Sequence, residues 1–350
     1  MNPRPLRRIF DASRLLSIAL LLLCARLANA EPLESPLELI YAPDSMLVAG
    51  PLIEINPAGR IVIGRKDVLS GKYPPPDKID VRVPTSVLGE LHVGDRYVIA
   101  YSMFRRDPRK ATGLIANKDG AVVLVSPGIE PALFHDTPEV RAILKAGRSE
   151  HGRESRRLFD LLLAALEGTD LQLQNLAAGE FAYERELAER FRDADRARVE
   201  KVARDARTPA HVRAMLIEGA SRRPDDLGGW WKNASLELVT TTPTGGYTPS
   251  DSEGQVALIL TAIDVLDRYA VAIPPDALAR WVRSASPSLV ERACVMLRRQ
   301  GADKERSAIE TALADPALPP ATRRFLDERL RRLDRIDERK RMRKEGSGRS

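Results

Sequence analysis

The side chains that most often carry catalysis or bind metal are few in this chain and lie far apart. The four histidines stand at separate positions: His92, His135, His151 and His211. None lies at the spacing from another histidine or a cysteine that a zinc site requires. The two cysteines, Cys24 and Cys294, form no C-x-x-C motif. The sequence therefore predicts neither a metal site nor a cofactor.

A serine close to a histidine is the only arrangement that resembles a nucleophile with its base. Ser149 and His151 lie in a Gly-Arg-Ser-Glu-His-Gly stretch that follows a predicted helix. A nucleophile elbow needs a preceding strand, so this context does not fit. The carboxylates are scattered among arginines along predicted helix faces, and no acid–base pair can be chosen from them. No catalytic residue is predicted, and a hidden enzyme site would need residues that meet only in three dimensions.

Two adjacent tryptophans are the first candidate for binding. Trp230 and Trp231 follow a Gly-Gly pair and precede Lys232, and a polar loop ending at Tyr247 comes soon after. Exposed tryptophans can anchor a protein partner or stack on a sugar. The same two rings could instead fill the hydrophobic end of a helix pair. Their burial would decide between these interpretations.

A short basic stretch is the second candidate. Arg105, Arg106, Arg109 and Lys110 lie between two predicted strands. Such a loop at the rim of a small barrel could hold an anionic group. The alternative is an ordinary solvated turn, since clustered charges are often simply exposed to water.

The first thirty residues have the composition of a secretory signal peptide. Basic residues precede an apolar run from Leu15 to Leu23, and Ala28-Asn29-Ala30 forms a cleavage site before Glu31. The apolar run is too short to span a membrane comfortably, and no later stretch is apolar enough. Arg7-Arg8 also resembles a twin-arginine signal, so both export routes stay open. We expect an exported protein, periplasmic or secreted.

The net charge is unevenly distributed. The chain as a whole is +6, and residues 1–30 contribute five Arg and one Asp to that total. Residues 321–350 contain twelve Lys/Arg and six Asp/Glu. An exported protein rarely meets nucleic acid, so the basic C-terminal tail could contact an anionic envelope polymer or lipid. A solvated helix end is the alternative.

Residues 31–130 have the pattern of short strands. Lys78–Val83 alternates polar and apolar residues, and Arg96–Tyr101 is rich in β-branched and aromatic residues. Gly113–Ala116 and Ala121–Val125 flank an Asp-Gly turn, which favours a hairpin. This pattern predicts a small β-barrel or sandwich.

Two motifs in this region carry a resemblance. Val68-Leu69-Ser70-Gly71 and the L-x-x-G-x-x-Y segment from Leu91 to Tyr97 follow one another as they do in netrin-like and tissue-inhibitor-like domains. Those domains have an OB-like barrel. The resemblance covers about residues 45–103 and lacks the cysteines of those domains, so it implies a fold and not an activity.

Helical periodicity fills residues 137–343, and residues 344–350 are expected to be a disordered tail. Helix starts recur at Thr208-Pro209, Thr248-Pro249, Ser286-Pro287 and Leu318-Pro319-Pro320. A D-x-x-x-P-x-x-x-R-x-x-L motif occurs twice, beginning at Asp205 and at Asp315. Gln255–Leu266 is apolar on nearly all sides and should be central.

This half resembles a HEAT-like α-solenoid, in which the concave face usually binds another protein. A compact irregular bundle is the alternative. The expected fold class is α+β, with the small barrel preceding the all-α array. The function that follows is a non-catalytic binding or scaffolding protein of the bacterial envelope. The alternative is an envelope hydrolase acting on cell-wall material, with its site at the junction of barrel and array.

Overall fold

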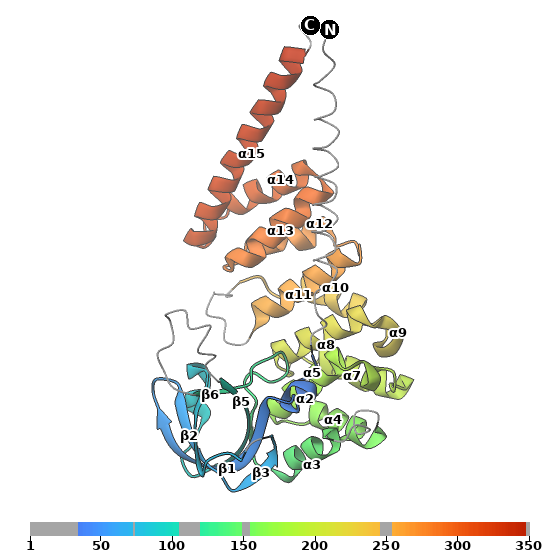
Figure 1. Ribbon diagram of the computed structural model, residues 1–350. Helices are drawn as coiled ribbons and strands as arrows, with labels where there is room; N and C mark the ends of the chain where they lie inside the picture. The colour runs from blue at the N-terminus through green and yellow to red at the C-terminus, as the bar shows by residue number, and fades with distance from the viewer. Residues whose placement is uncertain (1–33, 73, 105–119, 149–154, 246–253, 348–350) are drawn as a thin grey trace, which may run out of the picture. The chain divides into compact units, whose positions relative to one another are not determined.

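The computed structural model describes residues 34–72, 74–104, 120–148, 155–245 and 254–347 (Figure 1). Several predictions concern other parts of the chain. The signal peptide with its cleavage site at Ala30 and Glu31 lies outside the described residues, as does the Ser149–His151 pair. The helix start at Thr248-Pro249 also lies outside them. These remain predictions from the sequence.

The N-terminal region is a mixed β-barrel, as the sequence predicts. Its strands and one 3-10 helix follow in the order β1 Ser45–Asn56, β2 Arg60–Gly64, β3 Asp67–Ser70, β4 Lys78–Arg82, η1 Thr85–Glu90, β5 Arg96–Phe104, β6 Gly120–Val123 and β7 Leu133–His135. Five strands pair in the order β1-β2-β4-β6-β5, and β5 pairs back onto β1 to close the barrel. β3 pairs with the other side of β1, and β7 with β5.

Alternation of apolar and polar residues sets the barrel interior. In β4, Ile79 and Val81 are buried while their neighbours are exposed, because successive side chains of a strand point to opposite faces. The long pairing of β1 with β5 runs from Ser45 opposite Ser102 to Pro51 opposite Arg96. β4 and β6 are parallel, and the other strand pairs are antiparallel.

The L-x-x-G-x-x-Y segment forms the turn that leads into β5. Gly94 has a φ of 100°, which favours glycine, and its N–H donates to the Leu52 carbonyl at 2.8 Å. The Tyr97 phenol oxygen accepts from the His92 N–H at 3.4 Å. The glycine and the tyrosine of the motif therefore each have a local structural role. The Asp-Gly hairpin can be checked only in part, since residues 105–119 lie outside the described residues; Gly120–Val123 does form a strand.

The rest of the described chain is helical. The helices are α2 Pro36–Ile40, which precedes the barrel, and then α3 Pro138–Gly147, α4 Arg156–Glu167, α5 Leu171–Tyr183, α6 Arg185–Ala188, α7 Asp193–Arg204, α8 Ala210–Arg222, α9 Pro224–Leu227, α10 Trp231–Thr241, α11 Gln255–Arg268, α12 Pro275–Trp281, α13 Pro287–Gln300, α14 Ala302–Leu313 and α15 Pro320–Ser347. Residues 344–347, expected in a disordered tail, are the last residues of α15.

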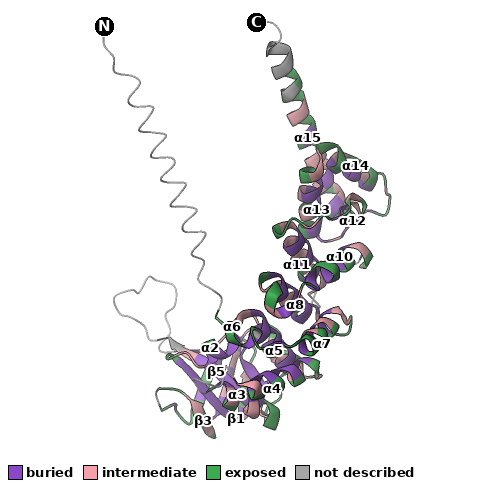
Figure 2. Ribbon diagram, turned by 90° about the vertical axis from the view of Figure 1, so that its right-hand side faces the viewer, coloured by how far each residue is buried: buried purple, intermediate pink, exposed green. Residues whose placement is uncertain are grey.

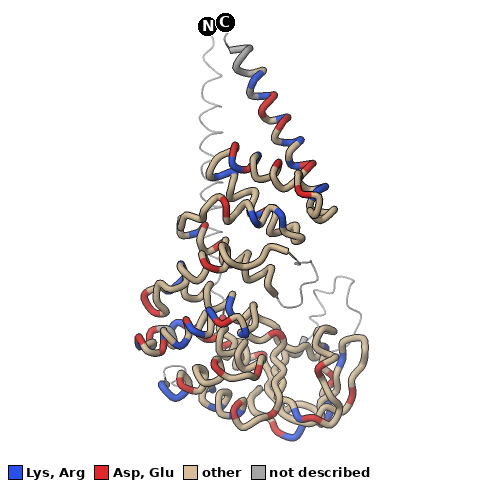
Figure 3. The backbone as a smooth tube through the Cα atoms, turned by 180° about the vertical axis from the view of Figure 1, so that it is seen from behind, with Lys and Arg blue, Asp and Glu red and all other residues tan. Residues whose placement is uncertain are grey.

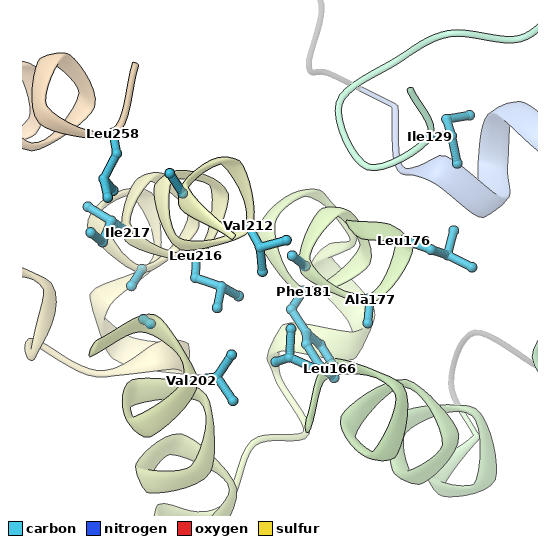
Figure 4. Packing of buried hydrophobic residues seen from close by; sticks show 14 of the residues in the cluster. Ile129, Leu166, Leu176, Ala177, Phe181, Val202, Val212, Leu216, Ile217 and Leu258 are labelled. Atoms are coloured by element: carbon cyan, nitrogen blue, oxygen red, sulfur yellow. The ribbon is translucent and has the colours of Figure 1, made fainter. Parts of the chain in front are cut away.

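The helices contact one another as two rows. In the first row α4, α7, α10, α12 and α14 contact in succession, and in the second row α5, α8, α11, α13 and α15 do so. Each first-row helix also contacts the second-row helix that follows it in the chain. Figure 4 shows the apolar residues between the rows, with Phe181, Val202 and Leu216 converging from different helices.

Helix α11 lies in the middle of this packing, as its composition predicts. Six of its residues are buried: Leu258, Ile259, Ala262, Ile263, Val265 and Leu266. It contacts α8, α10 and α13, and buried positions run along both α8 and α11 in Figure 2. The breadth of its apolar surface reflects contacts with three neighbours.

The arginine of the recurring motif makes a similar contact at both of its sites. Arg213 donates from Nε to the carbonyl of Ala203, at the end of α7, at 2.9 Å. Arg323 donates from Nη1 to the carbonyl of Leu313, at the end of α14, at 2.7 Å. The last carbonyls of a helix lack partners within that helix. In both copies, an arginine of the second helix supplies one.

Side chains of α5 and of the residue that follows it hold α2 against the array. The buried Glu180 carboxylate accepts from the Leu37 N–H at 2.6 Å, and Glu184 accepts from the Ser35 hydroxyl at 3.2 Å. Gly128 and Gly179 approach so closely that a Cβ on Gly179 would lie 2.8 Å from the Gly128 Cα. No helix among the described residues combines the length and apolar character that crossing a membrane requires.

Candidate functional site

The surface best suited to a ligand is an open groove between α4 and α7, at the ends where both helices stop. We call it the α4–α7 groove. Its volume is about 480 Å³, and it is lined by Leu166, Glu167, Gly168, Thr169, Leu171, Gln174, Lys201, Val202, Asp205, Arg207, Thr208 and Pro209. The loop from α4 to α5 forms one wall, and the loop from α7 to α8 forms the other.

An exposed leucine distinguishes this groove. Leu171 is 59% exposed, whereas Leu166 and Val202 beside it are buried. Leu171 is the first residue of α5, directly after the Asp170 N-cap, whose carboxylate accepts from the N–H groups of the next turn. Leu173, two residues further along α5, lies on the opposite side of the helix and is buried, so Leu171 faces outward. An exposed apolar side chain beside buried ones gives the groove an apolar floor.

Paired charges form the rim of the α4–α7 groove. The Arg198 guanidinium lowers the pKa of Glu167 through a hydrogen bond of 2.8 Å to Oε1. Arg207 lowers the pKa of Asp205 to about 2, through side-chain and backbone hydrogen bonds. Both carboxylates are therefore ionised and paired at neutral pH. The groove accordingly offers an apolar floor inside a polar rim, the composition of many protein interfaces.

Two further grooves lie between first-row helices. One, of about 350 Å³, is lined by α7 and α10 and includes Ala203 and Leu238. The other, of about 490 Å³, lies between α12 and α14 and includes Ala279 and Ala308. Grooves thus lie between three pairs of neighbouring helices in the first row: α4 and α7, α7 and α10, and α12 and α14. The exposed apolar side chain of Leu171 makes the α4–α7 groove the strongest candidate.

The two tryptophans singled out in the sequence are inside the array. Trp230 is 9% exposed and donates from Nε1 to the Leu227 carbonyl at 2.8 Å. Trp231 is 1% exposed and packs against the ring of Tyr269, with centroids 5.0 Å apart. The burial of both tryptophans favours the interpretation that these rings fill the end of a helix pair. An exposed aromatic anchor is not what the structure shows at these two positions.

The other predicted binding residues are only partly described. Lys232 is exposed, and its ammonium lies 5.6 Å from the centroid of the Trp231 ring. Tyr247 and the basic stretch Arg105, Arg106, Arg109 and Lys110 lie outside the described residues. The sequence analysis did not identify Leu171 as a candidate. The only indication in the sequence is that this leucine begins a helix and lies off the apolar stripe of that helix.

Charged groups at the junction of barrel and helices have structural partners. Asp136, whose side chain is 3% exposed, pairs with Arg141 of α3 and with Arg96 of β5. Hydrogen bonds from these guanidinium groups lower the pKa of Asp136. Arg141 also reaches Asp67 of β3. Thr137 caps the N-terminus of α3, and its side-chain oxygen accepts from the Val140 N–H at 3.3 Å.

The remaining candidates for chemistry are separate from one another. Cys294 is fully buried, and burial raises the pKa of its thiol to about 12. Within the part of the chain that the structure describes, no group of three His, Cys, Asp or Glu side chains could hold a metal ion. Comparison with models of protein families, with characterised proteins and with solved structures finds no match to this chain.

Proposed function

We propose that this protein is an exported, non-catalytic binding or scaffolding protein of the bacterial envelope, and that its helical array holds a protein partner in the α4–α7 groove. The exposed Leu171 on an apolar floor carries the proposal. Because Glu167 and Asp205 are already paired with arginines, a partner can insert an apolar side chain without leaving a buried charge unpaired.

Two finer features of the fold support this proposal. The barrel order β1-β2-β4-β6-β5, with β4 parallel to β6 and η1 between β4 and β5, supports an OB-like barrel. The two rows of helices, and the similar carbonyl contacts of Arg213 and Arg323, support a HEAT-like repeat. Arrays of this kind often present extended surfaces to other proteins. Export rests on the signal-peptide composition of residues 1–30.

Photocrosslinking in the producing cell tests the proposal. A photoreactive amino acid replaces Leu171 in one variant and Val125 in a control variant. Both side chains are 59% exposed, and Val125 lies beyond β6, outside the groove. We expect a discrete protein adduct from position 171 and none from position 125. Absence of an adduct at 171, or the same adducts from both positions, would contradict the proposal.

A further inference from the structure

The C-terminal helix α15 has one side packed on the array. Leu326 and Leu333 are buried on this side. Arg329 donates to the fully buried Glu305 of α14 at 2.6 Å, and Thr322 donates to the Ser284 carbonyl at 2.8 Å. Positions along α15 can therefore be assigned to an inner and an outer face from these contacts, since a helix turns by about 100° per residue.

Two acidic residues of α15, Asp334 and Asp337, are engaged by α14. The sequence predicts pairs within α15 from Asp327 to Arg331, Glu328 to Arg332 and Asp337 to Arg341. The structure shows the Glu328–Arg332 pair, at 3.3 Å. Asp337 instead accepts from Arg306 of α14 at 2.9 Å, and Asp334 accepts from the same guanidinium at 2.7 Å. Two of the negative charges of α15 thus bind a neighbouring helix and not the arginines of α15.

Four arginines share the opposite, outer face. Their spacings of seven, four and four residues place them in one stripe: Arg324, Arg331, Arg335 and Arg339. All four are exposed, and among the described residues no ion pair is recorded for any of them. Met342, 58% exposed, follows on the same face. Figure 3 shows basic and acidic positions alternating along α15, and on the outer face the four arginines outnumber the acidic residues, which are Asp327, Glu328 and Glu338.

We propose that this arginine stripe binds the phosphate groups of an anionic lipid bilayer. The stripe runs straight along about 22 Å of one helix face, at 1.5 Å per residue, and so can meet a flat surface along its whole length. A guanidinium binds phosphate through two parallel hydrogen bonds. Met342 supplies an apolar side chain at the end of the stripe. Glu328, on the same face, is neutralised by Arg332. The proposal is independent of the α4–α7 groove and of its partner.

Vesicle flotation tests this inference. The protein used in this experiment consists of residues 31–350. This range includes the compact unit Ser35–Ser350 and excludes the apolar segment of the predicted signal peptide. The vesicles contain phosphatidylglycerol and phosphatidylcholine, or phosphatidylcholine alone. One variant carries R331E, R335E and R339E. The control carries K78E, K145E and R157E, which change the net charge equally at exposed positions elsewhere.

We expect the protein to float only with the anionic vesicles, less so at high salt. A basic residue near an anionic surface is worth roughly a fivefold gain in affinity, so the stripe variant should bind on the order of a hundredfold more weakly. The control should bind within about threefold of the parent chain. Equal binding of stripe variant and control, flotation with neutral vesicles, or binding to soluble polyphosphate without flotation would overturn the proposal. Circular dichroism establishes that each variant is folded.

Discussion

The barrel and the helical array satisfy their polar backbone groups in different ways. In the barrel, strand pairing closes from β1 back onto β5, and no charged residue of the described strands is buried. In the array, five charged residues are buried: Glu180, Glu184, Asp195, Arg213 and Glu305. A closed barrel leaves few backbone groups of its paired strands without partners, whereas every helix end leaves several. The array must therefore place polar side chains inside.

Some carbonyls at the C-terminal ends of helices accept hydrogen bonds from side chains of a helix later in the chain. Gln174 of α5 donates to the Gly168 carbonyl beyond α4 at 2.6 Å, and Arg280 of α12 donates to the Thr242 carbonyl beyond α10 at 2.9 Å. Trp281 donates to the Val239 carbonyl at 2.9 Å. A helix end and its neighbour are thus joined by hydrogen bonds as well as by apolar contact.

The largest effect is expected from breaking the buried ion pair of the array. Glu305→Gln leaves Arg329 without its carboxylate and should lower the free energy of unfolding by about 3 to 5 kcal/mol. Urea denaturation measures this change. Glu310→Gln is the control, because Glu310 is exposed and lies 3.8 Å from Arg306. Equal losses from both substitutions would show that the Glu305–Arg329 pair contributes nothing specific.

Truncation of a core leucine, in contrast, should lower the unfolding free energy by a similar amount in the barrel and in the array. Leu47 in β1 and Leu258 in α11 are both fully buried. Truncation of either to alanine should lower the unfolding free energy by about 2 to 5 kcal/mol, since each loses the same buried methyl groups. Thermal and urea unfolding of the two variants provide the comparison. A loss below about 1 kcal/mol at either site would mean that the site is not part of a close-packed core.

The sequence predicted the fold class because it depends on periodicity. Alternation in Lys78–Val83 and the all-round apolar surface of Gln255–Leu266 gave the strand and the central helix. The Asp205 and Asp315 motifs predicted two equivalent helix starts, and their arginines make equivalent contacts. These features are local, so a short window of residues contains the information.

The candidate site could not be predicted in the same way. The tryptophan pair is as consistent with a core as with a binding surface, and only its packing on Tyr269 and the Leu227 carbonyl distinguishes them. Leu171 becomes a candidate because α7, far along the chain, supplies the other wall of its groove. The hydrogen bond from Arg306 to Asp337 likewise depends on how α14 packs against α15.

Acid should weaken the array through its paired carboxylates. Hydrogen bonds from Arg156 lower the pKa of Asp195 below its usual range. A carboxyl with a lowered native pKa stabilises the fold above its unfolded pKa of about 3.9, and this stabilisation is lost as the pH falls through the native pKa. Unfolding free energy should therefore fall below about pH 4, and more shallowly in Asp195→Asn. An identical acid profile in the variant would contradict this assignment.

A small stabilisation is expected at the end of α11. Ala270 has a φ of 53° and follows the helix as its left-handed terminating residue, with Val271 donating to the Leu266 carbonyl at 2.8 Å. Glycine adopts this conformation without the steric cost that alanine carries. Ala270→Gly should raise the unfolding free energy by up to about 1 kcal/mol. A fall in stability would show that the alanine methyl group packs favourably there.

The central claim about the array is that buried side chains supply the partners its helix ends lack. Measuring the unfolding free energies of Arg213→Met and Arg207→Met tests it most directly. Arg213 is 7% exposed and binds the Ala203 carbonyl, whereas Arg207, six residues earlier, is exposed and pairs only with Asp205 among the described residues. We predict a loss of about 2 kcal/mol for Arg213→Met and a change within about 0.5 kcal/mol for Arg207→Met. Equal changes would contradict the account.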